Sequence, residues 1–275
     1  MSRIKKALER AKAQGILPEQ QQEKTRPVRD EKPRGQIRPP LYFRTKVIDV
    51  PEEIFIRNKI VSVREGHPIS DQFKLLRTRI FNLTRETGRN TIQVSGFDVG
   101  EGKSTVSLNL AISMAKDTRQ TTLLVDADFR RPSIHCLLGL SNDTPGLKQY
   151  FEGQVELEDI FLNPGIDKLT ILPAGGRIVN STEVVGSAKM EALVLELKQR
   201  YLDRYIIFDT PGINVCPDPL VLLEYIDGLI LVARSDVTTT DSIKAAVNLV
   251  PNGKLLGTVL NDSRWQDSTT YHERY

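Results

Sequence analysis

Hydrophobic residues along this chain gather in short apolar runs that alternate with amphipathic helical patterns. The apolar runs predict buried strands at residues 91–94, 123–125, 169–172, 206–208, 229–233 and 256–260. Helical periodicity predicts a helix that begins at Lys103, helices over 69–82, 187–201 and 240–250, and two or three shorter helices within 133–180. Strands that alternate with helices predict the α/β class, with a doubly wound, mostly parallel sheet flanked by helices.

The N-terminal part of the chain carries a different pattern. Residues 2–14 place Ile4, Leu8 and Ala11 on one helical face, whereas residues 17–41 combine Gln, Arg and Glu with five prolines. A segment of the second composition cannot bury a core. We therefore predict three parts: a basic helix and flexible linker over 1–45, a folded domain over 46–262, and a flexible tail over 263–275.

Charge is distributed unevenly between these parts. The 275 residues include 38 Lys/Arg and 35 Asp/Glu, a net charge of +3. Residues 1–46 hold 13 Lys/Arg against 5 Asp/Glu, which gives +8, so the remaining 25 against 30 give −5. The basic arm is compatible with an acidic lipid, nucleic acid or protein surface, and equally with a solvated tether.

Cysteine content and hydropathy indicate the compartment. Cys136 and Cys216 are too few and too isolated for a disulfide framework or a metal cluster, which fits a reducing environment. The longest apolar run, 221–233, is interrupted by two acidic residues and a glycine, so we expect no membrane-spanning helix. Because the first residues also lack the apolar centre of a signal peptide, we expect a cytoplasmic protein.

The residues that join the first apolar strand to its helix carry the clearest chemical signal. They read Gly100-Glu101-Gly102-Lys103-Ser104-Thr105. Glycines let the backbone turn its N–H groups toward an anion, and the start of the helix adds unpaired donors and its dipole. We expect Lys103 to reach the β- and γ-phosphates of ATP and the Ser104 hydroxyl to ligate Mg²⁺. All six residues are therefore predicted to bind the nucleotide.

One position departs from the phosphate-loop pattern. In G-x-x-x-x-G-K-[ST], the first glycine falls where this chain has Phe97, and Gly96 lies one residue early. The pocket is expected to survive, because residues 100–105 supply most of the cradle. The sequence leaves the geometry of the rim at Phe97 open.

Acidic residues end two further predicted strands. Asp126 and Asp128 follow one apolar run, and Asp209 follows another. Ligands of open parallel sheets bind outside the carboxyl ends of the strands, so these carboxylates are expected to face the same cleft as Lys103. Metal or proton chemistry is the interpretation we favour beside a phosphate loop.

A structural interpretation of the first acidic pair is the alternative. Asp126 and Asp128 could cap the following helix or bind Arg130 or Arg131. Neither role requires a nucleotide.

Three motifs, GEGKST, LLVDADFRRP and IIFDTPG, together resemble those of the bacterial tyrosine autokinases (BY-kinases) of capsular and exopolysaccharide biosynthesis. The second is similar to the Walker A′ motif, an apolar run followed by D-x-D-x-R-x-P, which most P-loop ATPases lack. The resemblance covers residues 69–262, and the opening SRIKKALERA is similar to the start of autokinases from exopolysaccharide loci. It implies a P-loop kinase domain of the cytoplasmic split type, which a separate membrane protein of the polysaccharide co-polymerase type activates.

The resemblance also implies roles for individual residues. Lys103, Asp126 and Asp128 would be catalytic, with Asp126 receiving or orienting the hydroxyl of the attacking tyrosine. The metal would be ordered by Ser104, Asp128 and Asp209.

Two further roles follow from the same resemblance. Asn261 sits where related ATPases contact adenine, and Tyr271 and Tyr275 would accept the phosphate. Autophosphorylation of the tail would then regulate polymerisation and export of the polysaccharide. A homo-oligomer, either a ring or a dimer, is implied, and no nucleic-acid partner is expected.

The chain departs from the family at the residues that assemble the ring. Family members carry E-x-x-R-x-x-R on a helix, and the same positions here read Asp71, Lys74 and Arg77. Every charge sign is kept, but Lys cannot make the bidentate fork of Arg. The tail is also sparse in acceptors, since only Tyr271 and Tyr275 replace a dense tyrosine cluster.

Two other functions fit parts of the pattern. One is an ATPase switch of the chromosome-partition or septum-site type, although those proteins commonly carry a lysine where this loop has Asp98. The other is a non-catalytic nucleotide-binding scaffold of a polysaccharide machine, which the sparse tyrosines and the altered ring motif favour.

Overall fold

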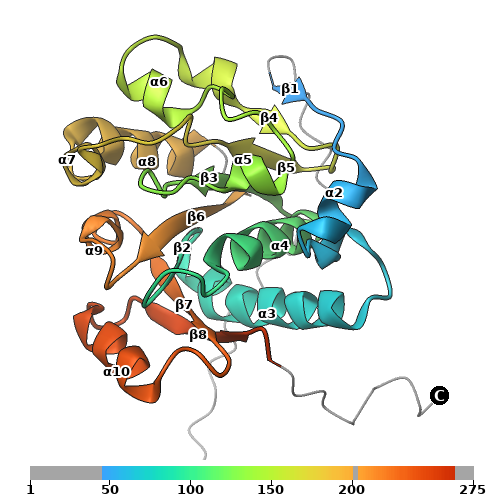
Figure 1. Cartoon of the computed structure of the whole chain (residues 1–275), viewed down its shortest axis with the longest axis vertical. Helices are drawn as coiled ribbons and strands as arrows, with labels where there is room; N and C mark the ends of the chain where they lie inside the picture. The colour runs from blue at the N-terminus through green and yellow to red at the C-terminus, as the bar shows by residue number, and fades with distance from the viewer. Residues whose placement is uncertain (1–44, 201–203, 264–275) are drawn as a thin grey trace, which may run out of the picture. The chain divides into compact units, whose positions relative to one another are not determined.

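The computed structural model describes residues 45–200 and 204–263. Predictions made for the N-terminal helix, for most of the linker and for Tyr271 and Tyr275 lie outside the described residues. Figure 1 shows the arrangement of the elements that are described.

One sheet runs through the described residues, with its strands in the order β1-β4-β5-β3-β6-β2-β7-β8. All neighbouring strands pair in parallel except β4 and β5, which are antiparallel. The strands are β1 Lys46–Val47, β2 Thr91–Gly96, β3 Thr121–Asp126, β4 Leu162–Asn163, β5 Leu169–Leu172, β6 Arg204–Gly212, β7 Gly228–Arg234 and β8 Leu255–Asn261.

Helices cover both faces of this sheet. The α-helices are α2 Glu52–Arg57, α3 Pro68–Thr84, α4 Lys103–Ala115, α5 Ile134–Leu137, α6 Leu147–Phe151, α7 Ser181–Val185, α8 Ala188–Arg200, α9 Asp218–Leu222 and α10 Thr240–Leu249. Single turns of 3₁₀ helix are η1 Val61–Val63, η2 Arg85–Thr87 and η3 Leu157–Ile160.

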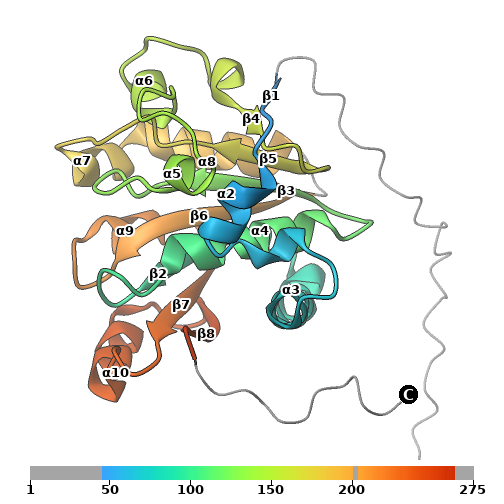
Figure 2. The same cartoon turned by 45° about the vertical axis from the view of Figure 1, so that its right-hand side comes forward.

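Alternation along the buried strands divides the apolar core into two layers. In β6, Ile206 and Phe208 belong to one hydrophobic cluster, whereas Tyr205 and Ile207 belong to the other. Successive side chains of a strand point to opposite faces, so a run that is apolar at every position must be covered on both sides. The first cluster includes residues of α7, α8, α9 and α10, and the second includes residues of α2, α3 and α4, as Figures 1 and 2 show.

The order of the strands brings the three sequence motifs together. β6 lies between β3 and β2, so the ends of the strands that carry the phosphate loop and the two acidic motifs are neighbours. Asp126 at the end of β3 pairs in register with Asp209 in β6. Because parallel strands end on the same edge, both carboxylates lie beside the loop that follows β2.

The predicted fold class and the long elements are confirmed. The helix predicted over 69–82 spans Pro68–Thr84, and its predicted apolar stripe is buried at Ile80 and partly buried at Phe73 and Leu76. One strand was expected within residues 133–180, but β4 adds a second, two-residue strand. So short a segment has no periodicity of its own, and its pairing with β1 and β5 is set by tertiary contacts.

Helix α8 offers a matched test of the packing. Leu193 is buried against the sheet, whereas Leu195, two residues along, is 48% exposed. Leu193→Ala is expected to lower the free energy of unfolding by about 2–5 kcal/mol, because it removes buried methyl groups and leaves a cavity. Leu195→Ala is the control, with an expected loss below about 1 kcal/mol. Denaturant titration measures both, and equal losses would contradict the assigned face of α8.

Candidate active site

The loop between β2 and α4 has the backbone conformation that a phosphate cradle requires. Gly100 and Gly102 adopt φ of +77° and +85°, in the left-handed region that L-residues with a Cβ rarely occupy. Gly102 is the N-cap of α4, and Lys103 is its first residue. The Lys103 ammonium lies inside the loop, where it donates to the Asp98 carbonyl oxygen at 2.5 Å. The predicted loop is therefore formed, with its lysine directed into its own turn.

Close approaches explain two of the glycines. A Cβ on Gly102 would lie 2.1 Å from Asn261 Nδ2, and a Cβ on Gly96 would lie 2.0 Å from Glu101 Oε2. Asn261 ends β8, and its amide donates to the Glu101 carbonyl oxygen at 2.9 Å. Gly96 thus has a packing role of its own, which the pattern of the phosphate loop did not indicate.

Glu101 braces the loop from within. Its carboxylate is buried and accepts hydrogen bonds from Thr238 Oγ1 at 2.7 Å and from the Asp98 N–H at 3.0 Å. Both carboxylate oxygens of Glu101 therefore accept hydrogen bonds within the protein. If Glu101 binds the nucleotide as predicted, it does so through its backbone N–H.

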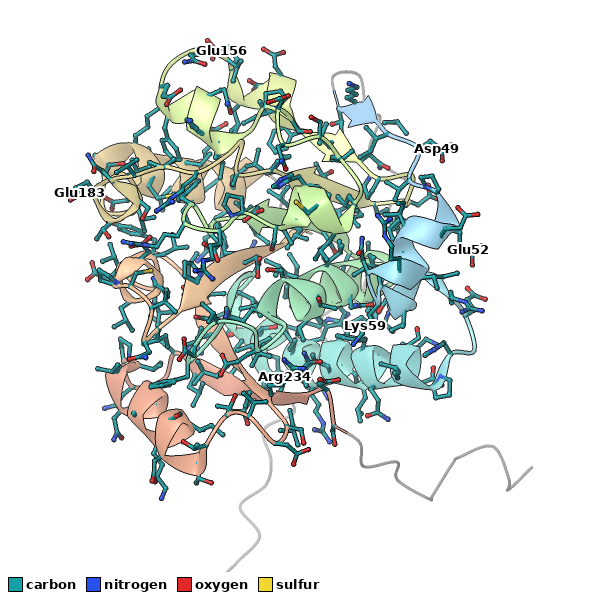
Figure 3. All side chains as sticks on the ribbon, viewed as in Figure 1. Asp49, Glu52, Lys59, Glu156, Glu183 and Arg234 are labelled. Atoms are coloured by element: carbon teal, nitrogen blue, oxygen red, sulfur yellow. The ribbon has the colours of Figure 1, made fainter. Side chains whose placement is uncertain are left out.

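Arg234 ties the loop to the edge of the sheet. Arg234, labelled in Figure 3, lies at the end of β7. Its guanidinium donates to the Gly100 carbonyl oxygen at 3.3 Å and pairs with Asp262 at 2.8 Å. The loop is thus held by residues of β7 and β8 as well as by its own chain neighbours.

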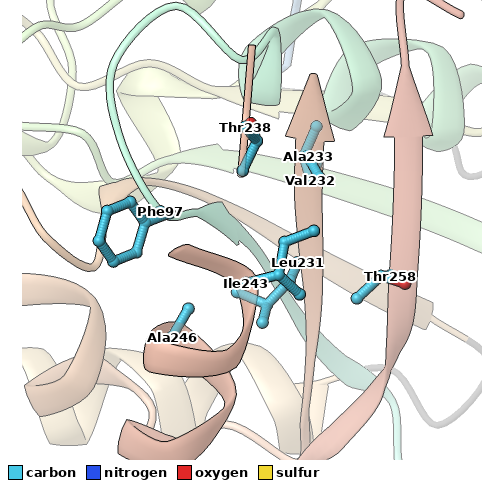
Figure 4. Close-up of a pocket in the computed structure, with 8 residues that line it drawn as sticks. All are labelled: Phe97, Leu231, Val232, Ala233, Thr238, Ile243, Ala246 and Thr258. Atoms are coloured by element: carbon cyan, nitrogen blue, oxygen red, sulfur yellow. The ribbon is translucent and has the colours of Figure 1, made fainter. Parts of the chain in front are cut away.

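Phe97 occupies the position of the missing first glycine without entering the cradle. Its ring lines an apolar cavity of about 10 Å³ between β7 and α10, together with Leu231, Ile243 and Ala246 (Figure 4). Phe97 does not have a positive φ, so its backbone conformation does not require glycine. The departure that the sequence analysis noted is therefore accommodated by turning the side chain into the core.

Asp126, the last residue of β3, and Asp209, within β6, form a buried acidic pair, and β6 continues to Gly212 beyond the strand end that the sequence predicted. Neither carboxylate is exposed. Asp209 Oδ1 accepts from Ser107 Oγ at 2.8 Å, and Asp126 Oδ2 accepts from the N–H groups of Ser133 and Ile134, both at 3.1 Å. The structural alternative considered for Asp126 is therefore real, since it caps the start of α5 while lying beside Asp209.

Burial governs the ionisation of both acids. It raises the pKa of Asp126 well above its ordinary value, and the neighbouring charge of Asp209 raises it further. Burial also raises the pKa of Asp209 to about 7, against the lowering effects of the Ser104 and Ser107 hydroxyls and of the Lys103 charge. A carboxyl group poised near neutrality can exchange a proton at physiological pH.

Asp128 lies on the loop that follows β3, close to the same charges. Its Oδ1 accepts from the N–H groups of Arg130 and Arg131, at 3.1 and 2.8 Å. Burial raises the pKa of Asp128, while these N–H groups and Lys103 lower it. The Arg130 side chain instead pairs with Asp218, so the predicted arginine contact of Asp128 is made through the backbone.

The donor set fits a hydrated Mg²⁺ ion held together with a nucleotide. Asp209 Oδ2 is buried and makes no hydrogen bond, so it is free to ligate a cation. Ser104 Oγ, in the first turn of α4, accepts from Ser133 Oγ at 2.7 Å. No group of three His, Cys, Asp or Glu side chains in the described ranges could hold a metal by itself. Phosphate oxygens and water must complete the shell, which is the usual way in which proteins bind Mg²⁺.

Two hydroxyls in this site were missed by sequence reasoning. Ser107 lies one helical turn beyond Lys103, and Ser133 follows the D-x-D-x-R-x-P motif directly. The i, i+4 spacing from Lys103 could have suggested Ser107. Ser133 gave no such signal, because its contact with Ser104 depends on how the two loops meet.

The residues of the altered ring motif are paired within the chain. Lys74 and Asp71 form an ion pair at 2.8 Å on α3, and both side chains are 46% exposed. Arg77 Nη1 donates to the Ser113 carbonyl oxygen at 2.6 Å, near the end of α4. Asp71, Lys74 and Arg77 thus have partners within their own chain. Ring assembly through these residues remains a prediction.

The described helices contain none with the length and apolar character needed to cross a bilayer.

Comparison with known proteins places this geometry in a family. The model for ParA, described as a NUBPL iron-transfer P-loop NTPase, matches residues 88–273. The putative tyrosine-protein kinase CapB of Staphylococcus aureus is 28% identical over 75% of this chain and 90% of its own length. Tyrosine-protein kinase CpsD of Streptococcus pneumoniae serotype 4 is 33% identical over 62% of this chain and 74% of its own. The VpsO kinase domain superposes with a TM-score of 0.61 at 30% identity, covering 71% of this chain and 98% of that domain.

The raised pKa of Asp209 predicts a pH dependence of stability. Between about pH 4 and pH 7 the folded state keeps a proton on Asp209 that the unfolded state has lost. The free energy of unfolding of the nucleotide-free protein is therefore expected to fall as pH rises through this range, by up to about 1.4 kcal/mol per pH unit from this group. Asp209→Asn is expected to reduce that slope, measured by denaturant titration at pH 5, 6 and 7.

Asp227→Asn is the matched control for this experiment. Burial alone would raise the pKa of Asp227, but its hydrogen bonds with Lys198 and Thr91 leave the pKa below its ordinary value. Its stabilising contribution is therefore complete above about pH 4, the ordinary range of an aspartate, and the slope between pH 5 and 7 should be unchanged. Identical slopes in Asp209→Asn and the unmodified protein would contradict the assigned protonation.

Proposed function

Because the chain belongs to the ParA family of P-loop NTPases and to the bacterial tyrosine-protein kinases, we propose that it transfers the γ-phosphate of ATP to the tyrosines of its own C-terminal tail. The observation that carries this proposal is the buried pair Asp126 and Asp209 beside Lys103, with Asp209 Oδ2 left without a hydrogen bond.

The residues of the phosphate loop act by positioning and charge neutralisation. Lys103, which donates to the Asp98 carbonyl in this structure, would bind the β- and γ-phosphates, and the N–H groups of residues 100–105 would donate to the phosphate oxygens. Asn261 lies against Gly102 and is proposed to contact the adenine. Phosphoryl transfer needs little covalent chemistry from the protein, so residues that position the phosphates and neutralise their charge can provide the catalysis.

The acids divide the remaining work between metal and proton. Ser104, Asp128 and Asp209 would hold Mg²⁺, which would supply charge neutralisation at the phosphates. Asp126 would receive or orient the proton of the acceptor hydroxyl, because burial and the neighbouring Asp209 raise its pKa and so make its carboxylate a stronger base. Three backbone N–H groups, those of Asp128, Ser133 and Ile134, keep its carboxylate fixed.

The biological role follows from the relatives and from the motifs. CapB and CpsD are named tyrosine-protein kinases, and the motifs resemble those of autokinases from capsule and exopolysaccharide loci. We propose that the protein acts in the cytoplasm, that a membrane protein of the co-polymerase type recruits and activates it, and that tail phosphorylation regulates polymer synthesis. The copies are proposed to assemble as a ring or dimer so that one tail enters a neighbouring site.

The kinase proposal is tested by following phosphotyrosine directly. The full chain is incubated with Mg-ATP, with and without a tyrosine-containing copolymer, and phosphate is located by mass spectrometry. Lys103→Ala is expected to reduce transfer by about 100-fold or more, since electrostatic clamps of this kind contribute several kcal/mol to the transition state. Lys254→Ala is the control, because Lys254 also donates to a carbonyl, that of Ile226, at the opposite edge of the sheet.

The position of the label distinguishes the alternatives. Phosphate on the tail that disappears in Tyr271→Phe/Tyr275→Phe supports autophosphorylation, whereas label on the copolymer alone assigns the acceptor to another chain. Nucleotide binding without any transfer beyond the Lys103→Ala level would favour the scaffold instead.

A further inference from the structure

A second buried acid, Asp218, lies at the same edge of the sheet but outside the predicted site. It is the first residue of α9, and its side chain is only 1% exposed. Arg130, in the loop after β3, donates from Nε to Asp218 Oδ2 at 3.2 Å and from Nη2 to Asp218 Oδ1 at 3.3 Å. This is a two-point contact, in which the planar guanidinium fixes the direction of the loop as well as its distance.

Two hydroxyls complete the environment of Asp218. Ser181 Oγ donates to Oδ2 and Thr182 Oγ1 donates to Oδ1, both at 2.6 Å, and Arg130 Nη2 also reaches Thr182 Oγ1. Burial by itself would raise the pKa of Asp218, but these hydrogen bonds and the guanidinium charge leave it below its ordinary value. The carboxylate is therefore ionised and fully used within the protein.

We call Asp218, Arg130, Ser181 and Thr182 together the Asp218 clamp. It joins three connections at the carboxyl edge of the sheet. Arg130 lies after β3, Ser181 and Thr182 begin α7 after β5, and Asp218 begins α9 after β6. A buried ion pair contributes little stability compared with apolar residues of the same volume, so stability alone does not account for it. Its distinctive property is geometric, because it fixes one loop relative to two others.

That loop carries an acid proposed to hold the metal. The same Arg130 whose side chain is clamped donates its backbone N–H to Asp128 Oδ1 at 3.1 Å, and the next N–H, that of Arg131, donates to the same oxygen at 2.8 Å. A displacement of the Arg130 guanidinium therefore moves the N–H groups that orient the Asp128 carboxylate.

We infer that Asp218 is a positioning residue for phosphoryl transfer, which acts by holding Arg130 so that the loop orients Asp128 toward the metal. Asp218 does not touch the nucleotide or the metal. The inference rests on the proposed role of Asp128 in the kinase site. It adds a residue that lies nine positions after Asp209 in the chain, in a segment without a nucleotide-binding motif.

The test compares two aspartates that each pair with a cation, the buried Asp218 and the partly buried Asp227, at opposite edges of the sheet. Asp218→Asn keeps the size of the side chain but removes the charge that holds the guanidinium. Asp227→Asn is the matched control, because Asp227 pairs with Lys198 at 2.5 Å and accepts from Asn90 and Thr91 at the amino edge of the sheet. Both variants lose a charged pair, but only Asp218 is connected to Asp128.

Two readouts are measured at matched folded fractions, checked by thermal denaturation. For Asp218→Asn, kcat at saturating Mg-ATP is expected to fall by about 10- to 100-fold, the usual range for residues that orient metal ligands, with KM for ATP within about twofold. The affinity for Mn²⁺ in the presence of ADP, followed by the electron paramagnetic resonance signal of free Mn²⁺, is expected to fall by about tenfold. Asp227→Asn should change neither.

Each outcome decides the inference. Retained kcat and Mn²⁺ affinity in Asp218→Asn would overturn it, as would equal losses in Asp227→Asn, which indicate general destabilisation. If Asp218→Asn does not fold, Arg130→Lys replaces it, since it keeps the charge but removes the fork, and losses in the same direction are expected. If the unmodified protein transfers no phosphate, the proposed function fails, and the Mn²⁺ measurement still tests Asp218.

Discussion

The structure of this protein depends on one electrostatic constraint, which is the burial of two carboxylates, Asp126 and Asp209, at the centre of the carboxyl edge of the sheet. A charge removed from water must be neutralised, protonated or compensated by directed dipoles. Here the compensation comes from the ends of α4 and α5: Lys103 and Ser107 from the first, and the N–H groups that precede the second. Asp209 Oδ2 is buried and lacks a hydrogen-bond donor, and this unpaired oxygen makes the site suitable for a cation.

The phosphate loop is also held by contacts with residues that are distant in the sequence. Asn261, Thr238 and Arg234 come from the last third of the chain, and each contacts a residue of the loop. Such contacts need the backbone to come close, so a side chain at Gly102 would collide with Asn261. The phosphate loop is thereby linked to the end of β8, the strand from which the chain continues toward the tail.

The clamp of Arg130 by Asp218 extends this arrangement outward. The carboxylates of Asp126 and Asp209 accept from backbone N–H groups and a hydroxyl. The carboxylate of Asp218 also accepts from the Arg130 guanidinium. The loop between β3 and α5 is thus fixed at two points. Asp126 binds the N–H groups at the start of α5, and Asp218 binds the side chain of Arg130. A loop held in this way can present Asp128 in one orientation, which a metal site requires because ligand geometry determines affinity.

Local pattern was sufficient for the large elements and insufficient for contacts between loops. Apolar runs such as residues 206–208 and the helical stripe of α3 identify themselves, because burial of a strand or a helix face imposes a period on the sequence. The position of Phe97 could not be assigned from the motif, since its ring is placed by β7 and α10. Glu101 lies inside the motif, yet its carboxylate is used by Thr238, more than a hundred residues away.

The sequence by itself determined that the chain is an α/β protein with a phosphate loop, and that acids follow two of its apolar runs. These properties depend on residues within a few positions of one another. Tertiary structure alone decided that β6 lies between β3 and β2, that Asp126 therefore faces Asp209, and that Arg130 is held by Asp218. The physical reason is that strand order and loop packing minimise exposed apolar area over the whole sheet, and no local period in the sequence records them.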